Sequence, residues 1–245
     1  MYSFMSLVLR LIQQWSVRRL LVAAFAAVNV GTALASPAHD EQLIQAALQM
    51  DRHPDRGALL YVKNCSSCHG PQAFGDSGRV IPSIAGQRRA YLIKQLADFT
   101  ERERHSDQMH KVVARAALRE PQTWVDIAAY LNSLPPAALQ ETGNGEGIEL
   151  GEAIFQEQCA SCHEEDARGD DDGFVPSLRS QHYSYLLRQM QALAAWHQRN
   201  VEPDLTRFLE SFKPDELTAV ADYLSRMQSP VRDRTRMDND GTAGD

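Results

Sequence analysis

The sequence predicts an all-α fold that consists of two small helical domains in tandem. Two observations carry this prediction. The second half of the chain repeats the first at an offset of 94 residues, and apolar residues recur with the spacing of amphipathic helices much more often than with that of strands. A repeat of this length is too long for a solenoid unit and suits two small domains. The 245 residues, 43% hydrophobic and 23% charged, have the composition of a globular protein.

Residues 1–35 are predicted to be a secretory signal peptide. They contain three arginines and no acidic residue, and a short apolar stretch runs from Leu20 to Val30. The sequence Ala33-Leu34-Ala35 before Ser36 is the small-x-small pattern that signal peptidase cleaves. We therefore expect cleavage near Ala35-Ser36, export to the periplasm and no stable membrane span afterwards. An uncleaved membrane anchor is the alternative interpretation.

The first domain is predicted to span residues 36–140. Leu43, Ile44, Ala47 and Leu48 lie on one face of a predicted helix. Proline at the start of another predicted helix suits its first turn, and the pair Pro135-Pro136 ends it. The helices expected in this domain cover residues 40–50, 57–64, 91–99 and 121–134.

A polar, glycine-rich linker is predicted at 141–147, and the second domain at 148–230. The repeat places helices of the second domain at 151–158, 185–193 and 214–227. Residues 231–245 are charged and polar and show no periodicity, so we expect a disordered tail.

The charge of the chain excludes one class of partner and favours another. The formal net charge is −7, which argues against binding of nucleic acid. Residues 36–140 contain 12 Lys+Arg and 11 Asp+Glu, whereas residues 141–245 contain 10 and 21. This asymmetry favours partners with a cationic docking face. The acids nearest the second cysteine motif are Glu164, Glu165, Asp166, Asp170, Asp171 and Asp172.

All four cysteines belong to two copies of one motif. Cys65-Ser66-Ser67-Cys68-His69 and Cys159-Ala160-Ser161-Cys162-His163 both have the C-x-x-C-H pattern that attaches c-type haem. The two thiols bond to the vinyl groups of one porphyrin, and the adjacent histidine ligates the iron. We therefore expect two covalently attached haem c groups, held by Cys65, Cys68, Cys159 and Cys162, with His69 and His163 as iron ligands. Two disulfides, one shared zinc site or a thioredoxin-like pair fit the in-phase repeat less well.

The sixth iron ligands are harder to identify from the sequence than the cysteines and histidines of the motifs. In the first domain Met109 lies between the motif and the last helix, and its neighbour His110 is the alternative. In the second domain the equivalent position is Pro203, and no methionine occurs from residue 191 to residue 226. His197 is the candidate there. The alternatives are an open or water-bound iron and a weak ligand such as Lys213.

Two prolines are predicted to support the haem histidines. Pro82 and Pro176 each follow their histidine by 13 residues. A haem histidine usually donates its second ring N–H to a carbonyl, which orients the ring. We expect each proline to supply that carbonyl; a simple turn is the alternative.

These motifs resemble tandem di-haem class I cytochromes c of the cytochrome c-four type. The resemblance covers about residues 55 to 228 and depends on four runs: Cys65–Gly70, Pro82–Gln87, Tyr91–Leu96 and Ile127–Leu131. It implies two class I cytochrome c domains, each around one haem with His and Met ligands, and periplasmic one-electron transfer. It also implies that the first helix of each domain crosses the last near the Gly/aromatic pairs.

The chain departs from that family in its second half. Ser180-Gln181 replaces Gly-Gln, Arg188-Gln189-Met190 replaces Lys-Gln-Leu, and the second methionine ligand is missing. From the resemblance, the expected function is still an electron carrier between redox proteins of the respiratory chain. The alternative is a haem enzyme, the haem subunit of an oxidoreductase or a gas sensor, with an open coordination site at the second haem.

Overall fold

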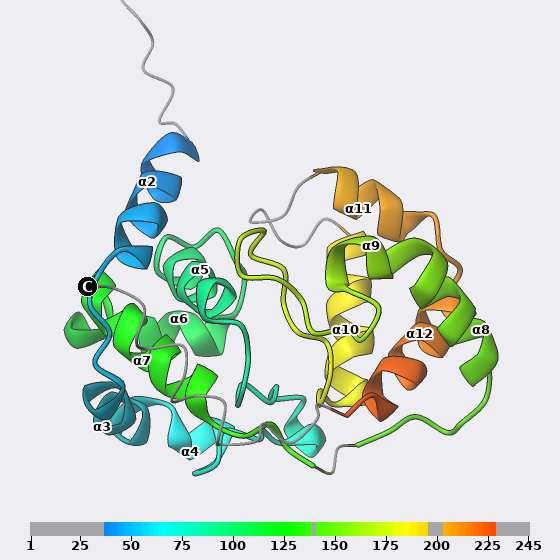
Figure 1. The fold of residues 1–245 in the computed structure, drawn as a ribbon, viewed down its shortest axis with the longest axis horizontal. Helices are drawn as coiled ribbons and strands as arrows, with labels where there is room; N and C mark the ends of the chain where they lie inside the picture. The colour runs from blue at the N-terminus through cyan, green and yellow to red at the C-terminus, as the bar shows by residue number, and fades with distance from the viewer. Residues whose placement is uncertain (1–36, 139–140, 196–202, 229–245) are drawn as a thin grey trace, which may run out of the picture. The chain divides into compact units, whose positions relative to one another are not determined.

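The computed structural model describes residues 37–138, 141–195 and 203–228 (Figure 1). The predicted signal peptide and the predicted tail at 231–245 lie outside these ranges. The described residues from 40 onward belong to one compact unit, which contains both repeats. Within the described ranges the regular structure is helical, with two isolated β-bridges at equivalent positions, Asp76–Ile81 and Asp170–Val175. The prediction of an all-α fold is therefore confirmed.

The first repeat contains six α-helices and two short 3-10 turns. Their bounds are α2 (Pro37–Leu48), α3 (Pro54–Asn64), α4 (Ser66–His69), η1 (Ser77–Arg79), α5 (Arg89–Thr100), α6 (Asp107–Val113), η2 (Ala116–Leu118) and α7 (Pro121–Ser133). All four helices expected here are present. The sequence did not reveal α6, which is only seven residues long and begins after Ser106, whose hydroxyl accepts from the Met109 N–H.

The second repeat has the same order. Its elements are α8 (Ile148–Ile154), the π-helical turn η3 (Phe155–Cys159), α9 (Ala160–His163), α10 (Tyr183–Ala194), α11 (Pro203–Glu210) and α12 (Pro214–Arg226). The three expected helices are present, the first of them divided between α8 and η3. The short helix α11 was not predicted. Each repeat has its own hydrophobic core, one centred on Tyr61 and Trp124 and the other on Phe155 and Leu224.

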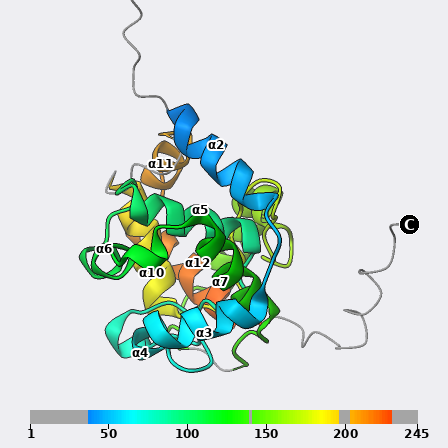
Figure 2. The ribbon, with the colours of Figure 1, turned by 90° about the vertical axis from the view of Figure 1, so that its left-hand side faces the viewer.

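A glycine marks the place where α3 crosses α7 and where α8 crosses α12, the helix crossings that the family resemblance implies. Helix α3 contacts α7, as Figure 2 shows, and α8 contacts α12. A Cβ atom on Gly57 would lie 1.9 Å from the Asp126 carbonyl oxygen, and one on Gly151 would lie 2.1 Å from the Ala219 carbonyl oxygen. The helices can approach this closely only because neither glycine has a side chain.

Helix α2 packs on the first core through the apolar face that the sequence predicts. Ile44 and Ala47 are buried, and Leu43 and Leu48 are half-buried against the same cluster. Burial of this face fixes the chain that leads into α3.

Hydrogen bonds hold the linker at 141–147 against the second repeat. The carboxylate of Glu141 accepts from Ser184 N (3.0 Å) and Ser184 Oγ (2.7 Å). Gly145 N donates to Asp222 Oδ2 at 2.7 Å, and Arg226 Nη2 donates to the Gly143 carbonyl at 2.9 Å. The exact domain boundaries stay a prediction.

Candidate haem-binding sites

Each C-x-x-C-H motif contains one short helical turn, which is α4 directly after α3 in the first repeat and α9 directly after η3 in the second. In the first motif the N–H groups of Cys68 and His69 both donate to the Cys65 carbonyl, at 3.1 and 3.0 Å. Residues three apart in a helical turn project to the same side, so the two thiols of a motif face one partner. None of the four cysteines is paired in a disulfide.

The two motifs belong to separate cores. Cys65 packs against the first hydrophobic cluster and Cys159 against the second. Before a haem is attached, burial raises the pKa of both thiols to about 11. This separation agrees with one prosthetic group per repeat rather than one zinc ion shared by both motifs.

A loop returns after each motif and brings a proline carbonyl to the histidine. In the first repeat Gly75 N donates to the His69 carbonyl at 2.9 Å, and the bridge between Asp76 and Ile81 closes the loop. The Pro82 carbonyl then lies 3.0 Å from His69 Nδ1. Since a carbonyl can only accept, Nδ1 carries the proton.

The second repeat reproduces this contact. Gly169 N donates to the His163 carbonyl at 2.9 Å, and His163 Nδ1 donates to the Pro176 carbonyl at 3.2 Å. The predicted role of both prolines is therefore confirmed. In a neutral imidazole that donates through Nδ1, Nε2 is the unprotonated nitrogen that can ligate a metal.

Burial keeps both imidazoles neutral. It lowers the pKa of His69 and His163 below the usual value, and the hydrogen bonds to Pro82 and Pro176 oppose this shift only in part. The neutral form is the one that binds iron. Two thiols one turn apart, followed by an imidazole with Nε2 available, are the donor set that a c-type haem requires.

Sequence reasoning missed one residue that supports the first motif. Tyr61 is buried in α3, and its hydroxyl donates to the carbonyl of Gly70, the residue after the motif. This bond ties the end of the motif back to the helix before it. The pairing of Tyr61 with Phe155 in the repeat was a possible signal, because the second repeat lacks this hydroxyl.

The structure places Met109 in the first turns of α6, with a half-buried side chain. The neighbouring alternative, His110, is engaged elsewhere, since its Nε2 donates to the Arg104 carbonyl at 2.8 Å. This favours Met109 over His110 as the sixth ligand of the first haem, which stays a prediction.

The second repeat has fewer candidates for a sixth iron ligand among its described residues. His197 lies outside the described residues. Pro203, the equivalent of Met109, is exposed and opens α11, and Lys213 is an exposed residue before α12. The sixth ligand of the second haem stays a prediction.

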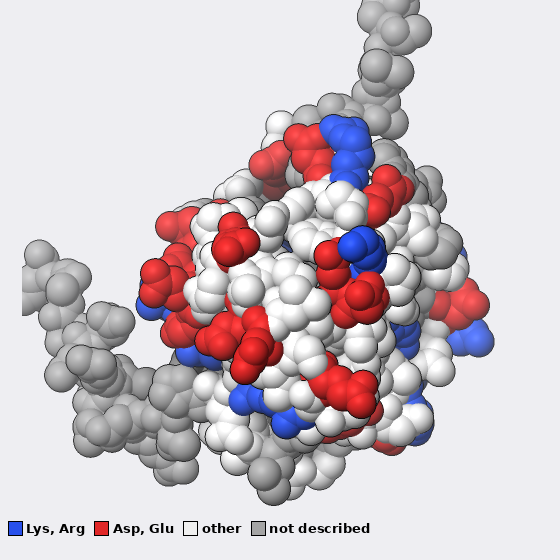
Figure 3. Space-filling view, turned by 90° about the vertical axis from the view of Figure 1, so that its right-hand side faces the viewer, with Lys and Arg blue, Asp and Glu red and all other residues white. Residues whose placement is uncertain are grey.

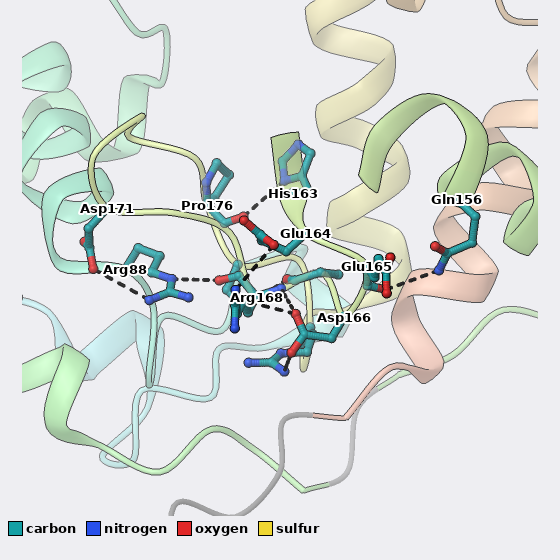
Figure 4. Close-up of polar contacts among 12 residues, drawn as sticks. Arg88, Gln156, His163, Glu164, Glu165, Asp166, Arg168, Asp171 and Pro176 are labelled. Atoms are coloured by element: carbon teal, nitrogen blue, oxygen red, sulfur yellow. Dashed lines mark hydrogen bonds and ion pairs between the residues drawn. The ribbon is translucent and has the colours of Figure 1, made fainter. Parts of the chain in front are cut away.

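The acids beside the second motif do not form a uniform negative surface, because several have cationic or backbone partners (Figure 4). Arg168 lies 3.3 Å from Glu164 and 3.9 Å from Asp166, and Asp166 also pairs with Arg179 at 2.8 Å. Asp171 lies 3.7 Å from Arg88. Ion pairs whose carboxylates face solvent contribute little to stability, but they reduce the local negative field.

Among the described helices, none combines the length and apolar character needed to cross a bilayer.

Comparisons with known proteins agree with this geometry. The cytochrome c family matches the chain twice, at residues 54–135 and at residues 148–228. Cytochrome c4 of Thiocapsa roseopersicina is 30% identical over 193 residues, which cover 74% of this chain and 95% of that protein. The thiosulfate dehydrogenase electron acceptor of Stutzerimonas stutzeri (strain A1501) is 28% identical over 193 residues, 75% of this chain and 88% of that protein.

A solved structure has the same fold. The crystal structure of reduced recombinant cytochrome c4 from Pseudomonas stutzeri matches with a TM-score of 0.64 and 21% identity, over 73% of this chain and 100% of that chain. The two family matches coincide with the two C-x-x-C-H motifs and their proline-supported histidines. The chain therefore belongs to the cytochrome c family, as a di-haem electron-transfer protein with two cytochrome c domains and two covalently attached haems.

Proposed function

We propose that this chain is a periplasmic carrier of single electrons between redox proteins of the respiratory chain. The observation that supports this most strongly is the same histidine geometry in both repeats, in which Nδ1 of His69 and of His163 donates to a proline carbonyl. A bound haem supplies an iron that gains or loses one electron. The protein fixes each imidazole, shields it from water and keeps it neutral, so that the ligand does not exchange protons during electron transfer.

The class of partner is part of this proposal. One relative is named as the electron acceptor of a thiosulfate dehydrogenase, and we propose a thiosulfate-oxidising dehydrogenase as the first donor to test. The acceptor would be a terminal oxidase or reductase of the same compartment.

Spectra of the purified holoprotein should separate a carrier from an enzyme or gas sensor. We expect two haems per chain, two reversible one-electron steps and no shift of the reduced spectrum on addition of carbon monoxide, since a filled coordination site suits electron transfer. The measurement is a redox titration followed by optical and resonance Raman spectroscopy. Fractionation of the producing cells tests the periplasmic location separately. A carbon monoxide complex of half the haem would instead support the alternative function, an open iron at the second haem.

That alternative has one specific observation in its favour. No methionine occurs from residue 191 to residue 226, so the second domain lacks the counterpart of Met109. An iron without a sixth protein ligand can bind a substrate or a small gas.

The acidic surface of the second domain supports docking of a cationic partner. Figure 3 looks onto the side of the molecule where α8 and α12 lie, and acidic side chains are spread widely over it. Glu149, Glu152 and Glu157 follow the outer side of α8 and η3, and all three are exposed. They add three acids to the six beside the second motif, several of which are paired, as candidates for attracting a cationic partner.

Neutralising Glu149, Glu152 and Glu157 to glutamine should slow association with a cationic redox partner roughly threefold to tenfold at low ionic strength, because exposed charges steer diffusional encounter. The measurement is the second-order rate of electron transfer against salt concentration, and its slope should flatten. A matched control changes Glu41, Glu101 and Glu120, exposed acids of the first domain, to glutamine. Equal effects of the two sets would show that only total charge matters and would refute this docking site.

A further inference from the structure

The contacts between the two repeats occur in pairs that are themselves related by the 94-residue repeat. Gln87 Nε2 donates to the Ser177 carbonyl at 2.9 Å, and Ser177 N donates to Gln87 Oε1 at 2.8 Å. Gln181 makes the same two bonds with Ser83, at 2.9 and 3.0 Å. The same patch of each domain therefore contacts the other, as in the isologous interface of a twofold dimer.

A second pair of contacts follows the same symmetry. Arg88 Nε donates to the Arg168 carbonyl at 2.7 Å, and His182 Nε2 donates to the Phe74 carbonyl at 2.8 Å. Arg88 and His182 are equivalent in the repeat, and so are Phe74 and Arg168. These two side-chain contacts to backbone carbonyls are therefore also matched on the two sides of the interface.

The N-termini of the two facing helices are also capped in a related way. Asp171 of the second domain accepts from Ala90 N in α5 at 2.8 Å. The equivalent N–H in α10, that of Ser184, donates to Glu141 of the linker at 3.0 Å. Each of these carboxylates satisfies a helix N–H that has no partner within its own helix.

Arg104 departs from this symmetry. It comes from the first domain, and the residue at the equivalent position, Gln198, is not among the described residues. Its backbone is fixed locally, because its N–H donates to the Asp98 carbonyl at 3.1 Å and its carbonyl accepts from His110. Its guanidinium carbon lies 4.9 Å from the centre of the Phe99 ring. With 7% of its surface exposed, it is a buried cation.

The guanidinium of Arg104 has acceptors in both domains. Its Nη1 donates to Gln95 of α5. Its Nη2 donates to the Tyr185 hydroxyl at 2.9 Å and to Gln189 Oε1 at 2.8 Å, both in α10. Gln95 and Gln189 are equivalent in the repeat, and Tyr185 is the equivalent of Tyr91, whose hydroxyl also interacts with Arg104.

We propose that Arg104 is a positioning residue that sets the orientation of the two haem domains and thereby the rate at which an electron passes from the reduced to the oxidised haem. The guanidinium is planar and presents its donors in fixed directions. Rotation of either domain would take acceptors away from a buried cation, which is costly. No bond forms or breaks in the exchange, so its rate depends on the distance and orientation that the interface fixes. The rate readout rests on the proposed function; the unfolding readout does not.

Arg104→Met tests this directly, because methionine keeps the apolar length of the side chain and removes every donor. In the holoprotein we expect electron exchange between the haems to slow severalfold, with both haem spectra unchanged, as measured by flash reduction. We also expect the coupling between unfolding of the two domains to weaken about tenfold, since hydrogen bonds to a charged group are lost. Arg104→Lys should restore only part of either effect, because an ammonium lacks the planar fork.

A second variant tests the other side of the interface. Tyr185→Phe with Gln189→Met removes the acceptors in α10 and leaves Arg104 in place, and it should reproduce both effects. Arg119→Met, at an exposed arginine of the first domain, is the matched control and should change neither. Unchanged exchange rates in both interface variants would overturn the proposal. If the wild type shows no exchange between haems, the claim that Arg104 sets its rate is refuted, and the unfolding coupling alone decides whether Arg104 orients the domains; the proposed function is judged separately by the spectra and the carbon monoxide test.

Discussion

Replacing Gly57 with alanine should destabilise the holoprotein by about 3 kcal/mol or more, as overpacking of a close contact does. A new Cβ would lie 1.9 Å from the Asp126 carbonyl oxygen and 2.5 Å from its carbon, both backbone atoms that cannot rotate away. Helix α3 would have to separate from α7. In an ordinary helix the same change would stabilise the protein by about 1 kcal/mol, so the expected sign is reversed here. Chemical denaturation followed by circular dichroism measures the change.

Gly151→Ala makes the equivalent test in the second domain, where the new Cβ would lie 2.1 Å from the Ala219 carbonyl oxygen. Gly78→Ala is the control, because its Cβ would meet no atom closer than Asp76 Oδ1 at 3.4 Å. We expect that control to change stability by less than about 0.5 kcal/mol. If Gly57→Ala lost no more stability than Gly78→Ala, the close crossing of α3 and α7 would be wrong.

The second large effect concerns Met109. Met109→Ala should lower the reduction potential of one haem by about 0.1 V or more, within the roughly 0.8 V range that axial ligands span. A thioether favours the reduced iron, so its loss favours the oxidised state. Spectroelectrochemistry measures both potentials, and any weak sulfur-to-iron absorption band should disappear.

Two further variants make this test specific. Met109→His should keep a six-coordinate, low-spin spectrum at a lowered potential, because imidazole replaces thioether as the ligand. Met190→Ala, a half-buried residue packed on the second core, should leave the potential of the first haem unchanged. Unaltered potentials in Met109→Ala would exclude Met109 as an iron ligand.

The helical fold was predictable because it depends on local patterns. Each helix signal involves residues that are close together in the chain. Examples are the proline at the start of α7 and of α12 and the apolar face of α2. The short helices α6 and α11 were missed because seven or eight residues give too few turns for a periodic pattern to stand out.

Two substitutions are misleading when only the sequence is considered. Glu164 and Ser180 stand where the first repeat has Gly70 and Gly86, which suggests altered turns. Both nevertheless have positive φ, 67° and 53°, like the glycines they replace. The bonds that fix the surrounding loop, such as that of Gly169 N to the His163 carbonyl, keep the turn despite its cost for a residue with a side chain.

The sequence by itself determined the chemistry of the sites. The spacing of two cysteines and a histidine, repeated in phase with the proline 13 residues later, specifies a haem attachment and its supporting carbonyl within a short stretch of chain. Only the tertiary structure decided how the domains meet and which charges are paired. Arg104 and Tyr185, or Arg88 and Asp171, are about 80 residues apart and carry no mutual signal in the sequence. Their contacts exist because two folded surfaces fit together, and that fit depends on the positions of whole helices rather than on the order of neighbouring residues.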